Sequence, residues 1–241
     1  MEEKRKRCGA VVLAAGAGKR MNSDTKKQFL LIEDKPVIYY SLKVFQESFI
    51  DEIVLVVSRE DIDYCKKEIA DKYQFSKIKY ITEGGRERYH SVAAGIKCLT
   101  DCDYVFIHDG ARPMITDEIL CRAYEGVRES NACVVGMPVK DTIKIVDQKG
   151  YVIQTPDRNR TWMIQTPQVF SYPLIRKAYD KLLKEEERLK EQKINITDDA
   201  MVVEVLMKHP VKLIEGSYEN IKITTPDDLI TVEKFKSRKP V

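Results

Sequence analysis

Short apolar segments alternate with longer amphipathic segments along most of this chain. The apolar segments are rich in β-branched residues and predict strands at residues 8–15, 52–58, 77–82, 103–109 and 132–139. The segments between them have helical periodicity and predict helices at residues 37–46, 60–73, 91–99 and 116–130. Strands that are apolar along their length and separated by helices indicate an α/β fold, with a mostly parallel sheet covered by helices on both faces. Ligands of such sheets bind beyond the carboxyl ends of the strands.

The alternation of strand and helix is interrupted near Val139. Residues 141–159 read as two period-2 segments around the turn DQKG, which predicts a β-hairpin that leaves the sheet. We expect a protruding β-arm at about residues 139–162, used for dimer contacts or for covering a site. Further elements follow, with helices predicted at 172–192, 195–208 and from 225 onward, and strands at 211–216 and 220–224. Because no linker interrupts the pattern, we expect residues 1–241 to form a single domain with an arm.

Composition narrows the class of protein. The 241 residues include 41 basic and 38 acidic side chains, a net charge of +3, which argues against a nucleic-acid-binding protein. No apolar stretch approaches the roughly 18 residues that a membrane span needs, and the charged N-terminus is not followed by the apolar segment of a signal peptide. The six cysteines show no CxxC spacing, so we expect reduced thiols and a cytoplasmic protein.

The first predicted strand runs into a loop with the sequence AAGAGKRM. Gly16 and Gly18 would let backbone N–H groups approach an anion, and Arg20 would add a bidentate donor. The loop is not a Walker motif, because Arg20 stands where Ser or Thr is needed, and it is not a dinucleotide fingerprint, because Met21 replaces the third glycine. An ordinary turn with surface charges fits these residues equally well.

Two further residues belong to the same hypothesis. Lys27 follows the loop closely, so that Arg20 and Lys27 could act on one phosphate chain, although a lone lysine is usually a solvated surface residue. Asp109 ends a buried strand, where a phosphate-bound Mg²⁺ would need a hard oxygen ligand. Arg112 could brace this acid or the ligand. The alternative is that Asp109 caps backbone amides in a turn.

A second pair of glycines, Gly84 and Gly85, follows the third predicted strand. They would let a flat ligand such as a nucleobase approach the backbone, with Arg88 as a support and Ser91 at the start of a helix. The alternative is a plain loop with a helix N-cap. Catalysis by a Ser-His-Asp triad is not expected, because the chain has three histidines and no serine-elbow motif. His108 is expected to pack or to form hydrogen bonds.

Three polar residues outside these loops are further candidates. Thr142 and Arg158 lie on the predicted arm. Lys222 lies in the short predicted strand NIKIT, where a lysine is costly unless it is exposed or paired.

Several of these segments together resemble a known family. The segment LAAGAGKRM followed by KKQFL is similar to the signature of sugar-nucleotide and polyol-phosphate nucleotidyltransferases. Further matches are GGRERYHSV, HDGARP, PVKDTIK, DRNRTWMIQTPQVF, ITDDA and NIKITTPDDL. In this order they resemble the family of 2-C-methyl-D-erythritol 4-phosphate cytidylyltransferases, from about residue 10 to residue 230.

The resemblance implies a fold, a reaction and a set of roles. The fold would be Rossmann-like, with a β-arm exchanged across a homodimer. The reaction would join CTP to 2-C-methyl-D-erythritol 4-phosphate, with release of pyrophosphate, in non-mevalonate isoprenoid biosynthesis. The implied catalytic residues are Arg20 and Lys27 on the triphosphate, with Arg158 (from the partner's arm) and Lys222 on the substrate phosphate. The implied nucleotide-binding residues are Ala14, Ala15, Gly16, Gly18, Gly85, Arg88, Ser91 and Arg112. Thr142 and Thr197 would also bind substrate, and Asp109 would bind Mg²⁺ or another divalent cation.

Two other functions remain open from the sequence. The first is a ribitol 5-phosphate cytidylyltransferase, although HDGARP and RTWMIQTPQ favour methylerythritol phosphate. The second is a non-catalytic nucleotide-sensing module, which would have no need to keep Lys27, Asp109 and Lys222 together. For the transferase we expect in-line attack on the α-phosphorus without a general base, because a phosphate monoester is already anionic near pH 7.

Overall fold

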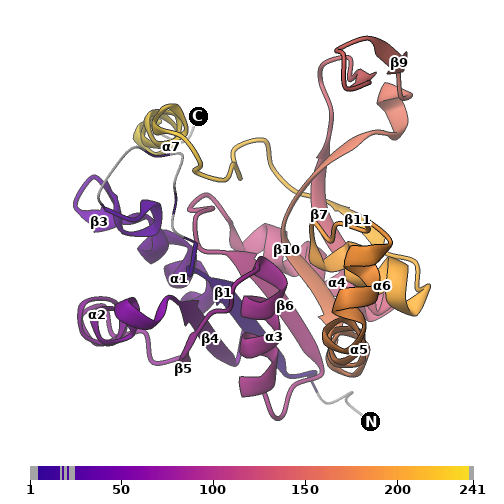
Figure 1. The fold of residues 1–241 in the computed structure, drawn as a ribbon. Helices are drawn as coiled ribbons and strands as arrows, with labels where there is room; N and C mark the ends of the chain where they lie inside the picture. The colour runs from indigo at the N-terminus through magenta and orange to yellow at the C-terminus, as the bar shows by residue number, and fades with distance from the viewer. Residues whose placement is uncertain (1–4, 17, 19–20, 22–24, 239–241) are drawn as a thin grey trace.

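A seven-stranded sheet forms the centre of the molecule (Figure 1). The computed structural model describes residues 5–16, 18, 21 and 25–238. The strand order is β11-β7-β10-β6-β1-β4-β5. The strands are β1 (Cys8–Leu13), β4 (Glu52–Val57), β5 (Ile78–Glu83), β6 (Tyr104–Asp109), β7 (Ala132–Pro138), β10 (Trp162–Ser171) and β11 (Lys212–Glu215). β10 runs antiparallel to its neighbours β6 and β7. The other neighbouring strands in the sheet are parallel to each other: β6 with β1, β1 with β4, β4 with β5, and β11 with β7. The predicted mostly parallel, Rossmann-like α/β fold is confirmed.

Helices cover both faces of this sheet. They are α1 (Val37–Glu47), α2 (Ile62–Tyr64), α3 (Arg88–Cys98), α4 (Asp117–Ser130), α5 (Tyr172–Glu191), α6 (Asp199–Met207) and α7 (Pro226–Ser237). Consecutive residues of β1 serve opposite faces: Ala10 and Val12 pack in the cluster with α1 and α4, and Val11 packs in the cluster with α3, α5 and α6. This double burial explains why the strands are apolar along their length.

Short elements complete the chain. The 3₁₀ turns are Lys27–Phe29, Arg59–Asp61 and Arg158–Arg160, and the short strands are β2 (Leu31–Ile32), β3 (Lys35–Pro36), β8 (Ile145–Val146) and β9 (Val152–Gln154). α2 continues as a π-helix over Cys65–Asp71, so the helix predicted at 60–73 is present but is not regular. No helix in the described part of the chain is long and apolar enough to cross a membrane. All six cysteines are free.

The longest strand, β10, was not predicted. It inserts between β6 and β7, where Gln168 pairs with Ile107 on one side and with Val134 on the other. Buried polar side chains interrupt its apolar pattern: Gln165 donates to the carbonyl of Ser217, and Gln168 donates to the carboxylate of Asp198. Because hydrogen bonds from distant segments satisfy these groups, the strand does not need an apolar sequence.

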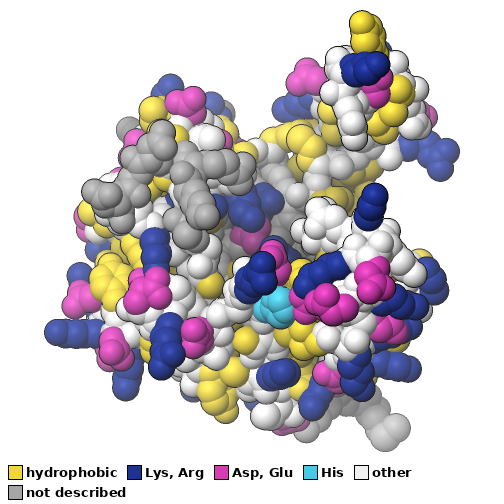
Figure 2. Space-filling model, viewed as in Figure 1, with side chains coloured by type: hydrophobic (Ala, Val, Ile, Leu, Met, Phe, Trp, Pro, Cys, Tyr) yellow, Lys and Arg dark blue, Asp and Glu magenta, His cyan; other side chains and the backbone are white. Residues whose placement is uncertain are grey.

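The predicted arm is present as a hairpin that projects away from the sheet beyond β7 and β10 (Figure 1). β8 and β9 pair antiparallel, and the carboxylate of Asp147 accepts the N–H groups of Lys149 and Tyr151 in the turn. Apolar side chains are exposed on the arm (Figure 2), and they are Ile143, Ile145, Val146, Tyr151, Val152 and Ile153. A two-stranded hairpin of this size is at best marginally stable alone, so this surface favours a covering partner.

One local prediction was wrong. Residues 220–224 form no strand: the backbone N–H of Ile223 donates to Ala111, which lies outside any ladder. The helix whose core was predicted at 91–99 is α3, and it begins at Arg88 because Glu87 caps it in a reciprocal pair of hydrogen bonds with His90.

The start of α7 offers a test of stability. The Oδ2 atom of Asp228 accepts hydrogen bonds from Thr224 N (2.8 Å), Thr224 Oγ1 (2.7 Å) and Thr225 N (2.8 Å). Burial raises the pKa of Asp228, but these hydrogen bonds outweigh it and leave the pKa below its usual value. We expect Asp228→Ala to lower the free energy of unfolding by about 1–2 kcal/mol at pH 7, as for the loss of a helix cap.

The same cap gives this prediction a pH dependence. The stabilisation is present above the unfolded-state pKa and is lost as the pH falls through the lower folded-state pKa, so the difference between the two proteins should shrink below about pH 4. Urea titrations at pH 7 and pH 3 measure it. Asp227→Ala, an exposed acid in the same turn, is the control and should cost only a few tenths of a kcal/mol.

Candidate active site

A cavity of about 380 Å³ opens beyond the carboxyl ends of β1 and β6, where the fold predicts a ligand site. Its described lining residues are Leu13, Ala14, Ala15, Gly16, Lys27, Gln28, Gly85, Arg86, Glu87, Arg88, Ser91, Asp109, Ala111 and Lys222. Nine candidates from the sequence therefore meet in one cavity: Ala14, Ala15, Gly16, Lys27, Gly85, Arg88, Ser91, Asp109 and Lys222. Among these described residues, four side chains are basic and two are acidic, which suits an anionic ligand.

The glycine loop forms one wall. Ala14 is fixed on both sides: its N–H donates to Val56 (2.7 Å), and its carbonyl accepts from Gln28 Nε2 (2.6 Å). A side chain at Gly16 would meet none of the described residues within 4 Å, so its backbone is open to a ligand on their side, and Gly18 has a φ of 65°, which favours glycine. The other predicted cation of this loop, Arg20, lies outside the described residues.

The second glycine pair has a packing role that the sequence did not reveal. A Cβ on Gly84 would lie 2.6 Å from the Cβ of Ala15 and 2.7 Å from Ser91 Oγ, so glycine is required for the two loops to touch. The N–H of Gly85 donates to Ser91 Oγ (3.1 Å), which ties this loop to the first turn of α3. Gly85 and Ser91 line the cavity, whereas the predicted room for a flat ligand at Gly84 is filled by protein.

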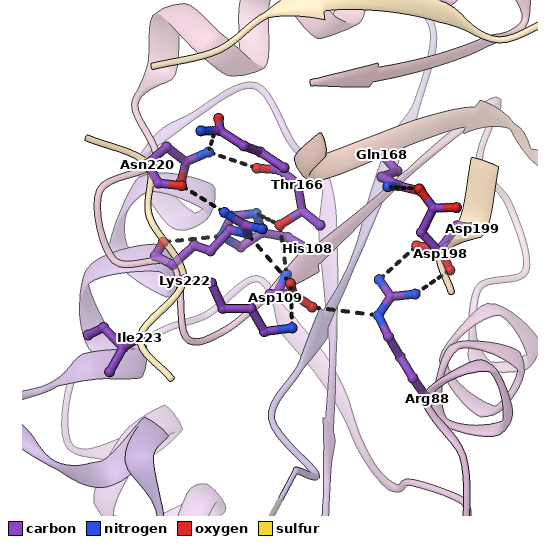
Figure 3. A network of polar contacts seen from close by, with 12 residues as sticks. Arg88, His108, Asp109, Thr166, Gln168, Asp198, Asp199, Asn220, Lys222 and Ile223 are labelled. Atoms are coloured by element: carbon purple, nitrogen blue, oxygen red, sulfur yellow. Dashed lines mark hydrogen bonds and ion pairs between the residues drawn. The ribbon is translucent and has the colours of Figure 1, made fainter. Parts of the chain in front are cut away.

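Asp109, at the end of β6, is surrounded by cations (Figure 3). Its Oδ2 lies 3.0 Å from Lys222 Nζ and 3.5 Å from Arg112 Nε, and its Oδ1 lies 3.7 Å from Arg88 Nε. Burial alone would raise the pKa of Asp109, but the charges of Lys222, Arg88 and Arg112 hold it well below its usual range. Asp109 is therefore ionised at neutral pH and gives the cavity a fixed negative charge.

Arg88 is held between two acids. Its two terminal nitrogens each lie 2.8 Å from an oxygen of Asp199, which is fully buried and also accepts a hydrogen bond from Tyr179. Burial lowers the pKa of Arg88, but Asp199 and Asp109 raise it by more, so its pKa is well above its usual value. Asp199 was not singled out from the sequence, because nothing in ITDDA shows which acid faces an arginine 111 residues away.

Two lysines from opposite ends of the chain meet in the cavity. Lys27 Nζ donates to the carbonyl of Ile223 (2.9 Å), and Lys222 pairs with Asp109. The expectation that Lys222 is either exposed or paired holds, because it is half-buried and paired.

Other candidates lie elsewhere. Arg112 is a buried neighbour of Asp109 that donates to the carbonyl of Asn220 (2.8 Å), and it is not among the described residues lining the cavity. Thr142 and Arg158 are exposed on the arm. Thr197 precedes α6, with its Oγ1 3.7 Å from the sulfur of Met201. These last three do not line the cavity of their own chain, as far as residues 5–238 are described.

His108 behaves as expected for a packed histidine. Its ring nitrogens lie 3.0 Å from Thr166 Oγ1 and 3.3 Å from the carbonyl of Arg112. Burial lowers the pKa of His108 to about 4, so it is neutral at pH 7. Its ring is fully buried and its nitrogens are engaged, so it is not placed to act as a general base.

The donor set of the cavity can be tested against a metal ion. No group of three or more His, Cys, Asp or Glu side chains that could hold a metal occurs within the described ranges, so a dedicated protein cage is not present there. Asp109 offers one ionised carboxylate beside a cavity suited to phosphates. One carboxylate together with phosphate oxygens and water is the usual environment of Mg²⁺, so these residues fit that ion.

Comparisons with known proteins agree with this geometry. The family model described as 2-C-methyl-D-erythritol 4-phosphate cytidylyltransferase matches residues 8–237. Proteins of that name from Lachnoclostridium phytofermentans and Lachnospira eligens are 49% and 51% identical, and the alignments cover 93% and 91% of this chain and 94% and 95% of those proteins. The crystal structure of 4-diphosphocytidyl-2C-methyl-D-erythritol synthase from Anaerococcus prevotii superimposes with a TM-score of 0.83 at 33% identity, over 97% of this chain and 99% of that one. The chain therefore belongs to the 2-C-methyl-D-erythritol 4-phosphate cytidylyltransferase family.

Proposed function

We propose that this chain transfers the cytidylyl group of CTP to 2-C-methyl-D-erythritol 4-phosphate. The products are 4-diphosphocytidyl-2-C-methyl-D-erythritol and pyrophosphate, in the non-mevalonate route to isoprenoids. The observation that carries the proposal, beside the family, is the convergence of Lys27, Asp109 and Lys222 with the glycine loop in one cavity. A nucleotide-sensing module would need the loop but not this set of charges.

The arrangement suits an in-line displacement. An oxygen of the methylerythritol phosphate attacks the α-phosphorus of CTP, the new P–O bond forms, and the bond to pyrophosphate breaks. The attacking phosphate is already anionic near pH 7, which agrees with the buried, neutral state of His108. Lys27 neutralises charge that develops on the triphosphate, a role that we extend to Arg20 from the family resemblance, and Lys222 orients the substrate phosphate.

Asp109 is the residue that would hold Mg²⁺. The bound ion would supply charge neutralisation on the triphosphate. Arg88 and Arg112 keep the carboxylate ionised and in place, and Ser91 ties the Gly85 loop to the first turn of α3. These side chains thus organise the cavity before any ligand enters.

We also infer a homodimer in which the arm of one subunit enters the site of the other. The apolar arm surface, with Ile145 and Ile153 exposed, favours burial against a second copy. Thr142 and Arg158 are carried on this arm away from their own cavity, so a role in substrate binding requires the cavity of the partner. Exchange of an identical element between protomers is a common way to form such dimers.

A direct assay tests the reaction. Pyrophosphate release is measured with CTP, Mg²⁺ and either methylerythritol phosphate or ribitol 5-phosphate. We expect kcat/KM to be at least about 10²-fold higher with methylerythritol phosphate, as for sites that recognise substrate hydroxyl groups. A preference for ribitol 5-phosphate would contradict the substrate assignment. Binding of CTP without release of its pyrophosphate in the presence of either acceptor would instead support a nucleotide-sensing module.

A further inference from the structure

The segment of residues 216–223 links the base of the arm to the cavity. It follows β11 and passes over the end of the sheet toward α7 without regular secondary structure (Figure 1). At its start, the N–H of Gly216 donates to the carbonyl of Gly136 in β7 (2.9 Å). The hydroxyl of Tyr218 then donates to the carbonyl of Pro138 (2.9 Å), where the arm begins. The segment is therefore attached to β7 at Gly216 and Tyr218, before the chain reaches the cavity.

Asn220 is fully buried in this segment, with an exposed fraction of 0%. Its Nδ2 donates to the carbonyl of Thr166 (2.9 Å) and to Oε1 of Gln165 (3.2 Å), both in β10 (Figure 3). Its own carbonyl accepts from Arg112 (2.8 Å), the same arginine that lies beside Asp109. A buried carboxamide with these partners fixes the path of the backbone that follows it.

The next three residues depend on that path. Lys222, two residues on, places its Nζ 3.0 Å from Asp109 Oδ2. The N–H of Ile223 donates to Ala111 (2.9 Å), and its carbonyl accepts from Lys27 Nζ (2.9 Å). The backbone of residues 222–223 thus positions both lysines of the cavity. Lys222 belongs to this stretch, and Lys27 donates a hydrogen bond to the carbonyl of Ile223.

We infer that Asn220 is a positioning residue for cytidylyl transfer, which sets Lys222 against Asp109 and the Ile223 carbonyl against Lys27. Asn220 is not among the described residues lining the cavity, so it acts through these groups and not by touching a substrate. The inference rests on the proposed function. Its physical basis is that a displacement of about 1 Å at a reacting group can cost 10²-fold in rate.

Asn220→Ala removes both donors and leaves the segment free to shift. We expect kcat to fall by about 10- to 100-fold and the KM for methylerythritol phosphate to rise, since Lys222 orients that phosphate. The Kd of CTP should stay within about threefold of the wild type, because the hydrogen bonds of Ala14 go to Val56 and Gln28, and Ser91 Oγ is hydrogen-bonded to Gly85, so that these described parts of the nucleotide site are held by groups outside the segment. Steady-state kinetics and calorimetric titration with CTP, both well below the melting temperature of each protein, measure the two effects.

Two further variants separate positioning from stability. Asn131→Ala removes the residue with positive φ that ends α4. It precedes β7, whereas the 216–223 segment contacts Gly136 and Pro138 toward the other end of that strand, so the change should lower the melting temperature with an unchanged kcat. Asn220→Ser keeps one hydroxyl donor and should have an intermediate kcat; it decides the question if Asn220→Ala does not fold. The inference is overturned if the folded Asn220 variants keep a kcat within about twofold of wild type, or if Asn131→Ala loses as much kcat. Failure of the wild-type protein itself to release pyrophosphate would instead reject the proposed function.

Discussion

Lys27→Ala is expected to lower kcat by about 10²- to 10³-fold, as for the loss of one preorganised electrostatic donor. The ammonium group of Lys27 lines the cavity and is held by the carbonyl of Ile223, so it faces the ligand without needing to be repositioned during the reaction. Its charge matters most when negative charge grows on the departing pyrophosphate. The change should therefore affect the transition state more than bound CTP, and the Kd of CTP should change by less than about tenfold.

The neighbouring residue supplies a matched control for this experiment. Lys26 is one position away, but its Nζ contacts Ser58 (2.6 Å), Asp61 (2.6 Å) and Glu60 (2.7 Å), and it does not line the cavity within the described chain. We expect Lys26→Ala to keep kcat within about twofold of wild type. Single-turnover kinetics with saturating CTP separate the chemical step from binding. A near-normal kcat for Lys27→Ala, or a loss confined to CTP affinity, would rule out the proposed role.

The outcome for the fold shows what an apolar pattern can reveal. The strands β1, β4, β6 and β7 were predicted because each packs apolar side chains on both faces, so that neither face needs polar residues. A search for apolar segments misses β10, because its buried Gln165 and Gln168 are polar. Their side chains form hydrogen bonds with partners 52 and 30 residues away. Such hydrogen bonds depend on tertiary structure and leave no periodic signal in the local sequence.

The residues of the site also fall into those that the sequence could locate and those that depend on tertiary contacts. Cavity residues that are marked by backbone freedom or by a position at a strand end, such as Gly16 and Asp109, could be located because strand ends are predictable. Asp199 could not, since its importance comes from Arg88 and Tyr179, which are contributed by other helices. The role of Gly84 was misjudged because its neighbours, Ala15 and Ser91, meet only in the folded protein.

A mixture of two inactive variants, one altered in the cavity and one altered in the arm, is expected to recover activity. Lys27→Ala removes a residue of the chain's own cavity, and Arg158→Ala removes a residue of the arm. If the arm serves the partner's cavity, each mixed dimer contains one site with both defects and one site with none. Random assembly makes about half of the dimers mixed, so the mixture should regain about a quarter of wild-type activity.

An arm that served its own subunit would give no recovery, since every site would then carry one defect. The control is a mixture of Lys27→Ala and Lys222→Ala, two residues that line the same cavity of one chain and cannot complement each other. The two variants are co-expressed with different tags, the mixed dimers are isolated, and pyrophosphate release is measured. Isolated mixed dimers of Lys27→Ala and Arg158→Ala should reach about half of wild-type activity. Mixed dimers that form but remain inactive would contradict exchange of the arm, because apolar contact between two copies alone cannot place Arg158 in the partner's site.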